Sequence, residues 1–208
     1  MAQLGIETRD EYAYTGLHAY VLVRHVSAES KHPKRNTAGF VTEFRGIVGD
    51  EGPVTSVVET AGAFKVLVHL RFDDSDDAGP MDALQSFLSE DRWDGVEYDV
   101  LLEGPAYTGP TNELIGFKRH TSKIVAIVKV WVEHGRAREV LGRLGDELGQ
   151  AFHGASIVFG DCDILLALEG SDVKTVAAAA LGRLQRIDGI AKTETSFTDW
   201  RRFTGEEY

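Results

Sequence analysis

The sequence has little cysteine, little positive charge and no long apolar run, and each shortage excludes a class of protein. The single cysteine, Cys162, cannot close an intrachain disulfide, which argues against a disulfide-stapled secreted scaffold. The chain has 22 Lys and Arg against 33 Asp and Glu, a formal net charge of −11, so nucleic acid is not an expected direct partner. No apolar stretch approaches the roughly 18 to 20 residues that cross a bilayer, and we expect no membrane contact.

Motifs of the common enzyme and metal sites are also missing. There is no Gly-x-Gly-x-x-Gly, P-loop or Gly-x-Ser-x-Gly sequence. The seven histidines form no His-x-x-x-His or Cys/His cluster, so we expect no metal site and no cofactor. Residues Met1 to Asp10 lack the basic start and apolar core of a signal peptide, and a cytoplasmic localisation is expected.

What is present is the composition of an ordinary globular protein and an internal repeat of pattern. Hydrophobic residues make up 43% of the chain and charged residues 26%. Runs of β-branched residues predict strands, and apolar residues three and four apart predict helices. The first half predicts, in order, a strand at 18–26, a helix with apolar positions from 40 to 48, strands at 54–60 and 63–72 about a turn at Ala61-Gly62, a helix at 80–91 and a strand at 95–102.

The second half predicts the same order of elements. These are a strand at 124–132, a helix at 136–152, a hairpin of strands 155–159 and 162–168 about Gly160-Asp161, a helix with Ser171 as its N-cap, and a strand at 190–197. The fold class is therefore α+β, with two tandem ferredoxin-like βαββαβ repeats. The predicted divisions are an arm at 1–16, repeat 1 at 17–103, a Gly- and Pro-rich linker at 104–121, repeat 2 at 122–198 and a tail at 199–208.

The strands are apolar on both faces, so each sheet needs a cover on the side that its helices leave open. Face-to-face packing of the two repeats would give a unit like a dimeric α/β barrel. Each repeat could instead pair with its counterpart in a second chain, and we expect a homo-oligomer.

The stretch from Ile124 to Thr198 resembles the effector-binding (RAM) domain of the Lrp/AsnC family, within the dimeric α/β-barrel superfamily. The resemblance rests on the hairpin Gly160-Asp161-Cys162-Asp163 with its apolar strands, and on a Gly189-Ile190 step before a Thr-rich strand. The family's helix-turn-helix has no counterpart in the first half, which argues against direct DNA binding.

The resemblance implies a non-enzymatic protein that senses a small amino-acid-like effector, oligomerises and assists transcription regulation. A separate DNA-binding regulator would be a candidate partner. The implied ligand-binding residues are Gly160, Asp161, Asp163, Thr193 and Thr195. A glycine turn exposes N–H groups to an anion, and an aspartate accepts from an ammonium. Alternatively, Asp161 shapes the turn, Asp163 makes a cross-strand pair and the threonines serve only as good strand formers.

A polar face in the first half supports a different hypothesis. His69 and Arg71 share a strand face, to which neighbouring strands could add Arg24, Glu97 and Asp99. If this face turned inward, the chain could be a small α/β-barrel enzyme, an oxygenase or a haem-dependent protein. The face could equally be partly solvated or form ion pairs that bridge the two sheets. A third hypothesis is an assembly module without ligand that uses exposed strand edges.

Overall fold

A computed structural model describes residues 7–8, 16–27, 36–49, 52–73, 79–108 and 124–199 of the chain. Its strands are β1 (Glu7–Thr8), β2 (Leu17–Val26), β3 (Val54–Glu59), β4 (Ala61–Gly62), β5 (Val66–Phe72), β6 (Val96–Thr108), β7 (Ile124–Val132), β8 (Phe152–Phe159), β9 (Ile164–Gly170) and β10 (Ile190–Asp199). Its helices are α1 (Thr37–Arg45), α2 (Pro80–Leu88), α3 (Ala137–Leu148) and α4 (Val173–Ala177). Shorter helical segments are η2 (Asp91–Trp93), η3 (Gly149–Ala151), η5 (Leu184–Arg186) and the π-helical η4 (Ala178–Arg183).

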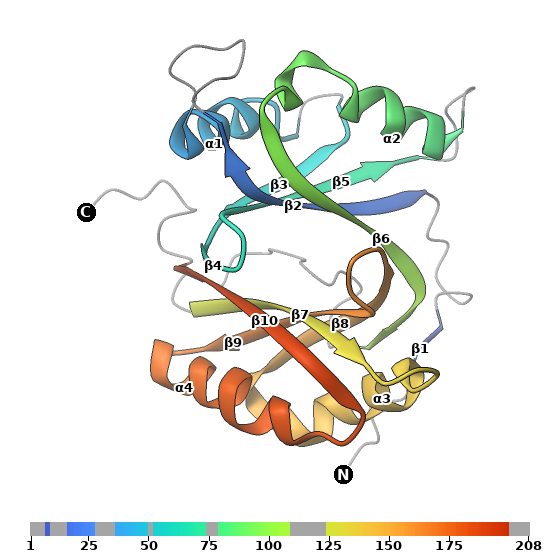
Figure 1. Ribbon diagram of the computed structural model, residues 1–208, viewed down its shortest axis with the longest axis vertical. Coiled ribbons are helices and arrows are strands. Elements are labelled where there is room, and N and C mark those ends of the chain that lie inside the picture. Colours follow the sequence, from blue (N-terminus) through green and yellow to red (C-terminus); the bar gives the residue numbers. More distant parts are fainter. Residues whose placement is uncertain are drawn as a thin grey trace.

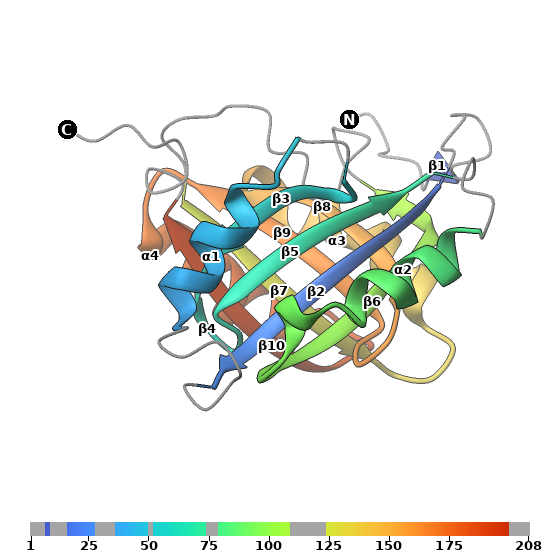
Figure 2. The same ribbon diagram turned by 90° about the horizontal axis from the view of Figure 1, so that it is seen from above.

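The strands form one large antiparallel sheet in the order β3-β5-β2-β6-β8-β9-β7-β10-β4, with β1 beside β6. The first four strands of this order come from the first half of the chain, and the next four come from the second half. Figure 1 shows the two sets as layers that face each other, with α1 and α2 outside one layer and α3 and α4 outside the other. The view from above shows strands of the two layers crossing one another (Figure 2). The architecture is a mixed α+β fold consistent with ferredoxin-like folds.

Three apolar cores follow from the alternation of side chains along each strand. One core lies beneath α1 and α2 and includes Phe40, Phe44 and Leu84. A second lies beneath α3 and α4 and includes Leu141, Leu144 and Val176. The third contains strand residues of both halves and lies between the layers. Because a fully buried leucine or isoleucine contributes roughly 1.5 to 3 kcal/mol, this third core holds the two halves together.

α1 and α4 begin at side chains that accept a hydrogen bond from a backbone N–H group of the first turn. Asn36 accepts a hydrogen bond from the N–H of Gly39 at 2.9 Å and caps α1. The cap of α4 is Asp172, which accepts from the N–H of Thr175 at 2.8 Å, so the expected cap at Ser171 was wrong by one residue. None of the helices in the described ranges is long and apolar enough to cross a membrane.

Two strand boundaries differ from the sequence prediction. β6 runs to Thr108, beyond the expected end at Leu102, because it pairs with β2 and then with β8. Ala61 and Gly62 do not form a tight turn: they pair as β4 with β10. A Cβ at Gly62 would lie 2.4 Å from the carbonyl oxygen of Thr195, so this approach requires glycine. The rest of the expected linker, most of the arm and the tail from residue 200 lie outside the described residues.

Candidate functional site between the two layers

Alternate side chains of the strands fill the space between the two layers. Along β2, Tyr20 and Leu22 point into this space, whereas Ala19, Val21 and Val23 pack beneath the helices. The middle of the space is apolar and includes Leu22, Leu67, Leu101, Ile127 and Leu165. Polar side chains occupy its two ends, near His18 and near Arg24. These two residues are six apart on one strand, which corresponds to about 20 Å.

The first end holds a buried cluster of four side chains, which we call the histidine cluster: His18, Tyr20, His69 and Glu103. His18 Nδ1 lies 2.8 Å from His69 Nε2, at hydrogen-bond distance. Tyr20 donates its hydroxyl hydrogen to Glu103 Oε2 over 3.1 Å, and its ring stacks on that of His69 with centroids 4.8 Å apart. The side chains of His18 and Glu103 are only 4% and 1% exposed. Neighbouring strands build the cluster, because Tyr20 of β2 is in register with His69 of β5 and Leu101 of β6.

This arrangement can accept and release a proton. One imidazole donates its N–H to the other, so one hydrogen lies between two basic ring nitrogens. Glu103 Oε2 lies 3.9 Å from His18 Nδ1, where its negative charge would stabilise the resulting imidazolium. The histidine cluster therefore has the groups required for general acid–base chemistry in an apolar setting.

The opposite end holds the ionic cluster, which we define as Arg24, Asp99, Lys129, Asp161 and Glu194. Lys129 Nζ lies 2.7 Å from Asp161, 3.3 Å from Glu194 and 3.6 Å from Asp99. Arg24 lies 2.6 Å from Asp99 and 3.3 Å from Asp161. Arg24 and Asp99 come from the first half, and the other three come from the second half. The ionic cluster thus bridges the two layers.

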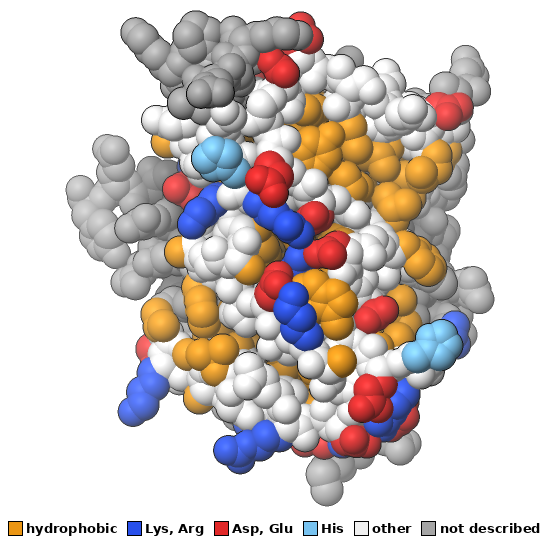
Figure 3. All heavy atoms as spheres, in the orientation of Figure 1, with side chains coloured by type: hydrophobic (Ala, Val, Ile, Leu, Met, Phe, Trp, Pro, Cys, Tyr) orange, Lys and Arg blue, Asp and Glu red, His pale blue; other side chains and the backbone are white. Residues whose placement is uncertain are grey.

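Charge and burial set the protonation of the ionic cluster. Hydrogen bonding to Lys129 lowers the pKa of Asp161 despite partial burial. Burial by itself would lower the pKa of Lys129, but hydrogen bonds to Asp161 and Glu194 outweigh it and raise this pKa. The shifts of Arg24, Lys129, Asp161 and Glu194 all favour the charged form. Figure 3 shows side chains of both charge signs intermingled between the two layers, as expected for a cluster that is open to solvent on one side.

The structure divides the polar face that the sequence predicted. His69 lies in the histidine cluster, and Arg24 and Asp99 lie in the ionic cluster. Arg71 instead pairs with Asp73 at 3.0 Å on the surface, and Glu97 is exposed. The two expected uses of this face, an inward histidine site and ion pairs between the sheets, thus occur at opposite ends of the same space.

Sequence reasoning missed two members of the histidine cluster. Glu103 was assigned to the end of repeat 1 because the strand was expected to stop at Leu102. His18 was treated as one of several scattered histidines. Extending the period of two along each strand, from Asp99 through Leu101 to Glu103 and from Leu22 through Tyr20 to His18, would have found both.

The five residues expected to bind an effector do not share one surface. Asp161 belongs to the ionic cluster, and Asp163 accepts the backbone N–H of Val132 at 2.8 Å. Gly160 is held against β6, since a Cβ there would lie 2.6 Å from the carbonyl oxygen of Val100. Thr193 and Thr195 lie on the face of β10 opposite Glu194.

The remaining reactive groups contribute little to this site. Burial raises the pKa of the Cys162 thiol to about 12, so the thiol is unreactive at neutral pH. Within the described ranges, no three His, Cys, Asp or Glu side chains are grouped so that they could hold a metal ion.

Comparisons with known proteins give similarity of fold alone. No protein-family model and no curated protein matches the chain. A solved structure of an anthrone oxidase-like protein matches with a TM-score of 0.53 and 11% identity, covering 94% of each chain. A mutant chlorite dismutase from Candidatus Nitrospira defluvii matches with a TM-score of 0.50 and 10% identity, covering 95% of this chain and 99% of that chain. A second mutant of that dismutase matches with a TM-score of 0.50 and 10% identity, covering 92% and 94%.

These neighbours correct the Lrp/AsnC interpretation. They align with nearly the whole chain, whereas the resemblance to an effector-binding (RAM) domain concerned the second half only. That resemblance was wrong because a glycine-aspartate hairpin and a Thr-rich last strand also suit this fold, in which both hairpin aspartates make internal contacts. The hypothesis of a non-enzymatic, amino-acid-sensing transcription regulator is withdrawn with it.

Proposed function

We propose that the chain is an enzyme of the oxidoreductase class that uses the histidine cluster as a general base toward a small, largely aromatic substrate and dioxygen. The observation that carries this proposal is the 2.8 Å contact between His18 Nδ1 and His69 Nε2, buried beside Glu103. Burial of a linked histidine pair with a carboxylate is costly unless hydrogen bonds compensate for it, and such arrangements are concentrated at functional sites.

The fold supports this proposal. We interpret it as two tandem ferredoxin-like repeats that pack like a dimeric α/β barrel. Within each half the strands have the same order, with the first strand between the third and the fourth. The β6–β8 and β10–β4 pairings join the two layers along both edges. In this arrangement the second repeat covers the open sheet face of the first, and the histidine cluster lies inside.

The reaction needs only the groups present and dioxygen. The histidine pair removes a proton from an acidic C–H of the substrate, and Glu103 stabilises the imidazolium that forms. The resulting carbanion is electron-rich and is oxidised by O₂: for an activated methylene, the carbon becomes a carbonyl, with one oxygen atom of O₂ entering it and the other leaving as water. Tyr20 and Leu101, which belong to the apolar core beside the cluster, would contact an aromatic substrate that reached it.

A haem-dependent reaction is the second candidate for these residues. Haem iron takes an imidazole nitrogen as its axial ligand. In this structure Nε2 of His69 and Nδ1 of His18 bind each other. No step of the proposed reaction uses haem.

Oxygen uptake with anthrone as the probe tests the proposal. This compound has an activated methylene between aromatic rings, and one structural neighbour is named as anthrone oxidase-like. We expect the chain to consume O₂ and to form anthraquinone. His69→Gln should lower the rate at least about 100-fold, because loss of a general base typically costs 10² to 10⁴.

The matched control is His134→Gln, which changes an exposed histidine in the turn after β7. This variant should retain the wild-type rate. An equal rate in His69→Gln and the wild-type chain would refute the role of the histidine cluster. A Soret band on addition of hemin, with activity that depends on it, would instead favour the haem reading.

A further inference from the structure

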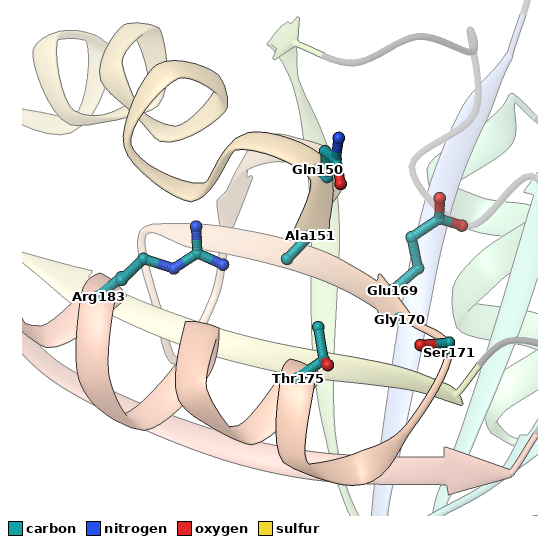
Figure 4. A pocket seen from close by; sticks show the side chains of 7 residues that line it. All are labelled: Gln150, Ala151, Glu169, Gly170, Ser171, Thr175 and Arg183. Atoms are coloured by element: carbon teal, nitrogen blue, oxygen red, sulfur yellow. The ribbon is translucent and has the colours of Figure 1, made fainter.

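A pocket of about 620 Å³ lies in the second half, outside the space between the layers. Its volume is within the range of small-molecule sites, about 300 to 1,000 Å³. It is lined by η3, the end of β9, the turn that follows and the helix that begins with α4. Gln150, Ser171, Thr175 and Arg183 supply most of its polar groups, as Figure 4 shows.

Arg183 supplies a positive charge that no acidic side chain neutralises among the described residues. Its guanidinium group extends across the pocket toward Ala151 (Figure 4). The only carboxylate of the lining, that of Glu169, points away from the guanidinium and lies 3.3 Å from His153 Nδ1. Arg24, Arg71, Arg136 and Arg143 have carboxylate partners, whereas Arg138 and Arg186 on the surface resemble Arg183 in having none among the described residues; of these three, only Arg183 lines the pocket. Within the described part of a chain whose formal net charge is −11, the pocket thus holds a cation without an acidic partner.

The hydroxyl groups of Ser171 and Thr175 in the pocket already donate their hydrogens to another side chain. Ser171 donates to Asp172 Oδ2 over 3.1 Å, and Thr175 donates to the same oxygen over 2.9 Å. Their oxygen atoms can thus only accept further hydrogen bonds. The Gln150 amide can both donate and accept. The lining therefore suits a ligand that carries several hydroxyl donors.

The π-helical segment η4 determines where Arg183 lies. After one turn of α4, the chain continues as a π-helix from Ala178 to Arg183. The wider turn rotates later side chains about the helix axis relative to an uninterrupted α-helix. Such segments are rare and are often found at functional sites. The pocket and the π-helix are separate observations, and both involve Arg183.

We propose that this pocket, which we call the Arg183 pocket, binds a polyhydroxylated monocarboxylate, the class of the aldonic and uronic acids. The carboxylate would bind the guanidinium group in a charge-assisted pair, and one negative charge matches the one free cation. The ligand hydroxyls would donate to Ser171 and Thr175 and exchange hydrogen bonds with Gln150. The site is independent of the histidine cluster.

Calorimetric titration of the full chain with gluconate tests the proposal, with glucuronate as a second probe. Glucose, which has the hydroxyls without the charge, and hexanoate, which has the charge without the hydroxyls, should each bind at least about tenfold more weakly than gluconate. Arg183→Gln should weaken gluconate binding by a similar factor or more. The matched control, Arg186→Gln, changes an exposed arginine one turn later and should leave the affinity unchanged.

Three results would overturn the proposal: no binding of gluconate or glucuronate, unchanged affinity in Arg183→Gln, or binding of hexanoate or inorganic phosphate as tight as that of gluconate. If circular dichroism shows that Arg183→Gln does not fold, the salt dependence of gluconate binding to the wild-type chain tests the ion pair instead. Its gluconate affinity should fall as sodium chloride is raised, and a salt-independent affinity would contradict the ion pair. Because the readout is binding heat, the result is separate from any oxidase activity.

Discussion

The histidine cluster and the ionic cluster share one face of β2 and of β6, yet they differ in charge, burial and partners. Glu103 at one end is 1% exposed and accepts from a tyrosine hydroxyl. Asp161 at the other end is 44% exposed and pairs with a lysine and an arginine. The first cluster is built around two titratable rings, and the second is built from fully ionised groups of both signs.

This difference indicates separate roles. Ion pairs that bridge the two layers fix how the halves meet, and they remain charged across the neutral pH range. Hydrogen-bonded imidazoles can both donate and accept a proton, which suits acid–base chemistry and adds little to rigidity. We therefore expect substitutions in the ionic cluster to affect stability and substitutions in the histidine cluster to affect activity.

The largest expected effect on stability comes from Lys129→Met. The Lys129 side chain is 3% exposed and is the buried cation among three partly exposed carboxylates, so its loss leaves their repulsion balanced only by Arg24 and Lys192 at the rim. Breaking a buried ion pair by removing one partner typically costs 3 to 5 kcal/mol, and we expect about 3 kcal/mol in the free energy of unfolding, measured with urea.

Lys174→Met is the control for this substitution, because Lys174 is an exposed residue of α4. Its effect should stay within about 0.5 kcal/mol. A loss below about 1 kcal/mol in Lys129→Met would show that the ionic cluster does not hold the halves together.

A smaller energetic effect, on rate instead of stability, is expected for Glu103→Gln. The amide can still accept from Tyr20 but cannot stabilise an imidazolium, so the oxygen-uptake rate should fall about 10- to 100-fold. The low-pH limb of the pH–rate profile should move to lower pH, because the histidine pair holds its extra proton less tightly. Glu97→Gln, on the exposed end of the same strand, should change neither quantity.

Gly160→Ala tests how the hairpin holds Asp161 in the ionic cluster. Gly160 has φ of +154°, and a Cβ there would lie 2.6 Å from the carbonyl oxygen of Val100 and 2.7 Å from Leu101 Cδ2. We expect a loss of about 2 kcal/mol in unfolding free energy. Gly135→Ala has φ of +80° and open space around it, so it should cost only about 1 kcal/mol. Equal losses in the two variants would show that the close approach to β6 is unimportant.

The smallest effect is on the pH dependence of stability. The pKa of Asp161 is lowered in the folded chain, so its contribution is present above its unfolded pKa and is lost as the pH falls through the folded value. Because Asp161 is 44% exposed, we expect less than about 1 kcal/mol, lost below about pH 4. Asp161→Asn should have a shallower decline in the acid range, measured by urea unfolding at several pH values; an unchanged slope would contradict the pairing.

Much of the fold could be predicted because the patterns that specify it are local. The period of two along the strand from Ile124 to Val132 and the period near 3.6 in α3 identified their elements directly. The end of β6 could not be predicted, because Gly104 and Pro105 resemble a linker and only the residues on either side of them pair with β8. Pairing between strands of the two layers cannot be recognised from the local sequence.

The candidate site could be predicted only in part for the same reason. The shared face of His69 with Arg24 and Asp99 followed from strand periodicity. Which of these residues meet depended on the register of β2 with its two neighbours and on partners from the other half, such as Lys129. The Gly160–Asp161 hairpin was misinterpreted because its sequence suits both an effector loop and a structural junction.

The most direct test of the account is the rate of oxygen uptake with anthrone per folded molecule, compared between His69→Gln and Lys129→Met. The account predicts that His69→Gln stays folded and loses at least about 100-fold in rate. Lys129→Met should be less stable, yet each folded molecule should keep a rate close to that of the wild-type chain. Loss of stability without loss of rate in His69→Gln would contradict the central claim. The histidine cluster would then have only a structural role, like the ionic cluster.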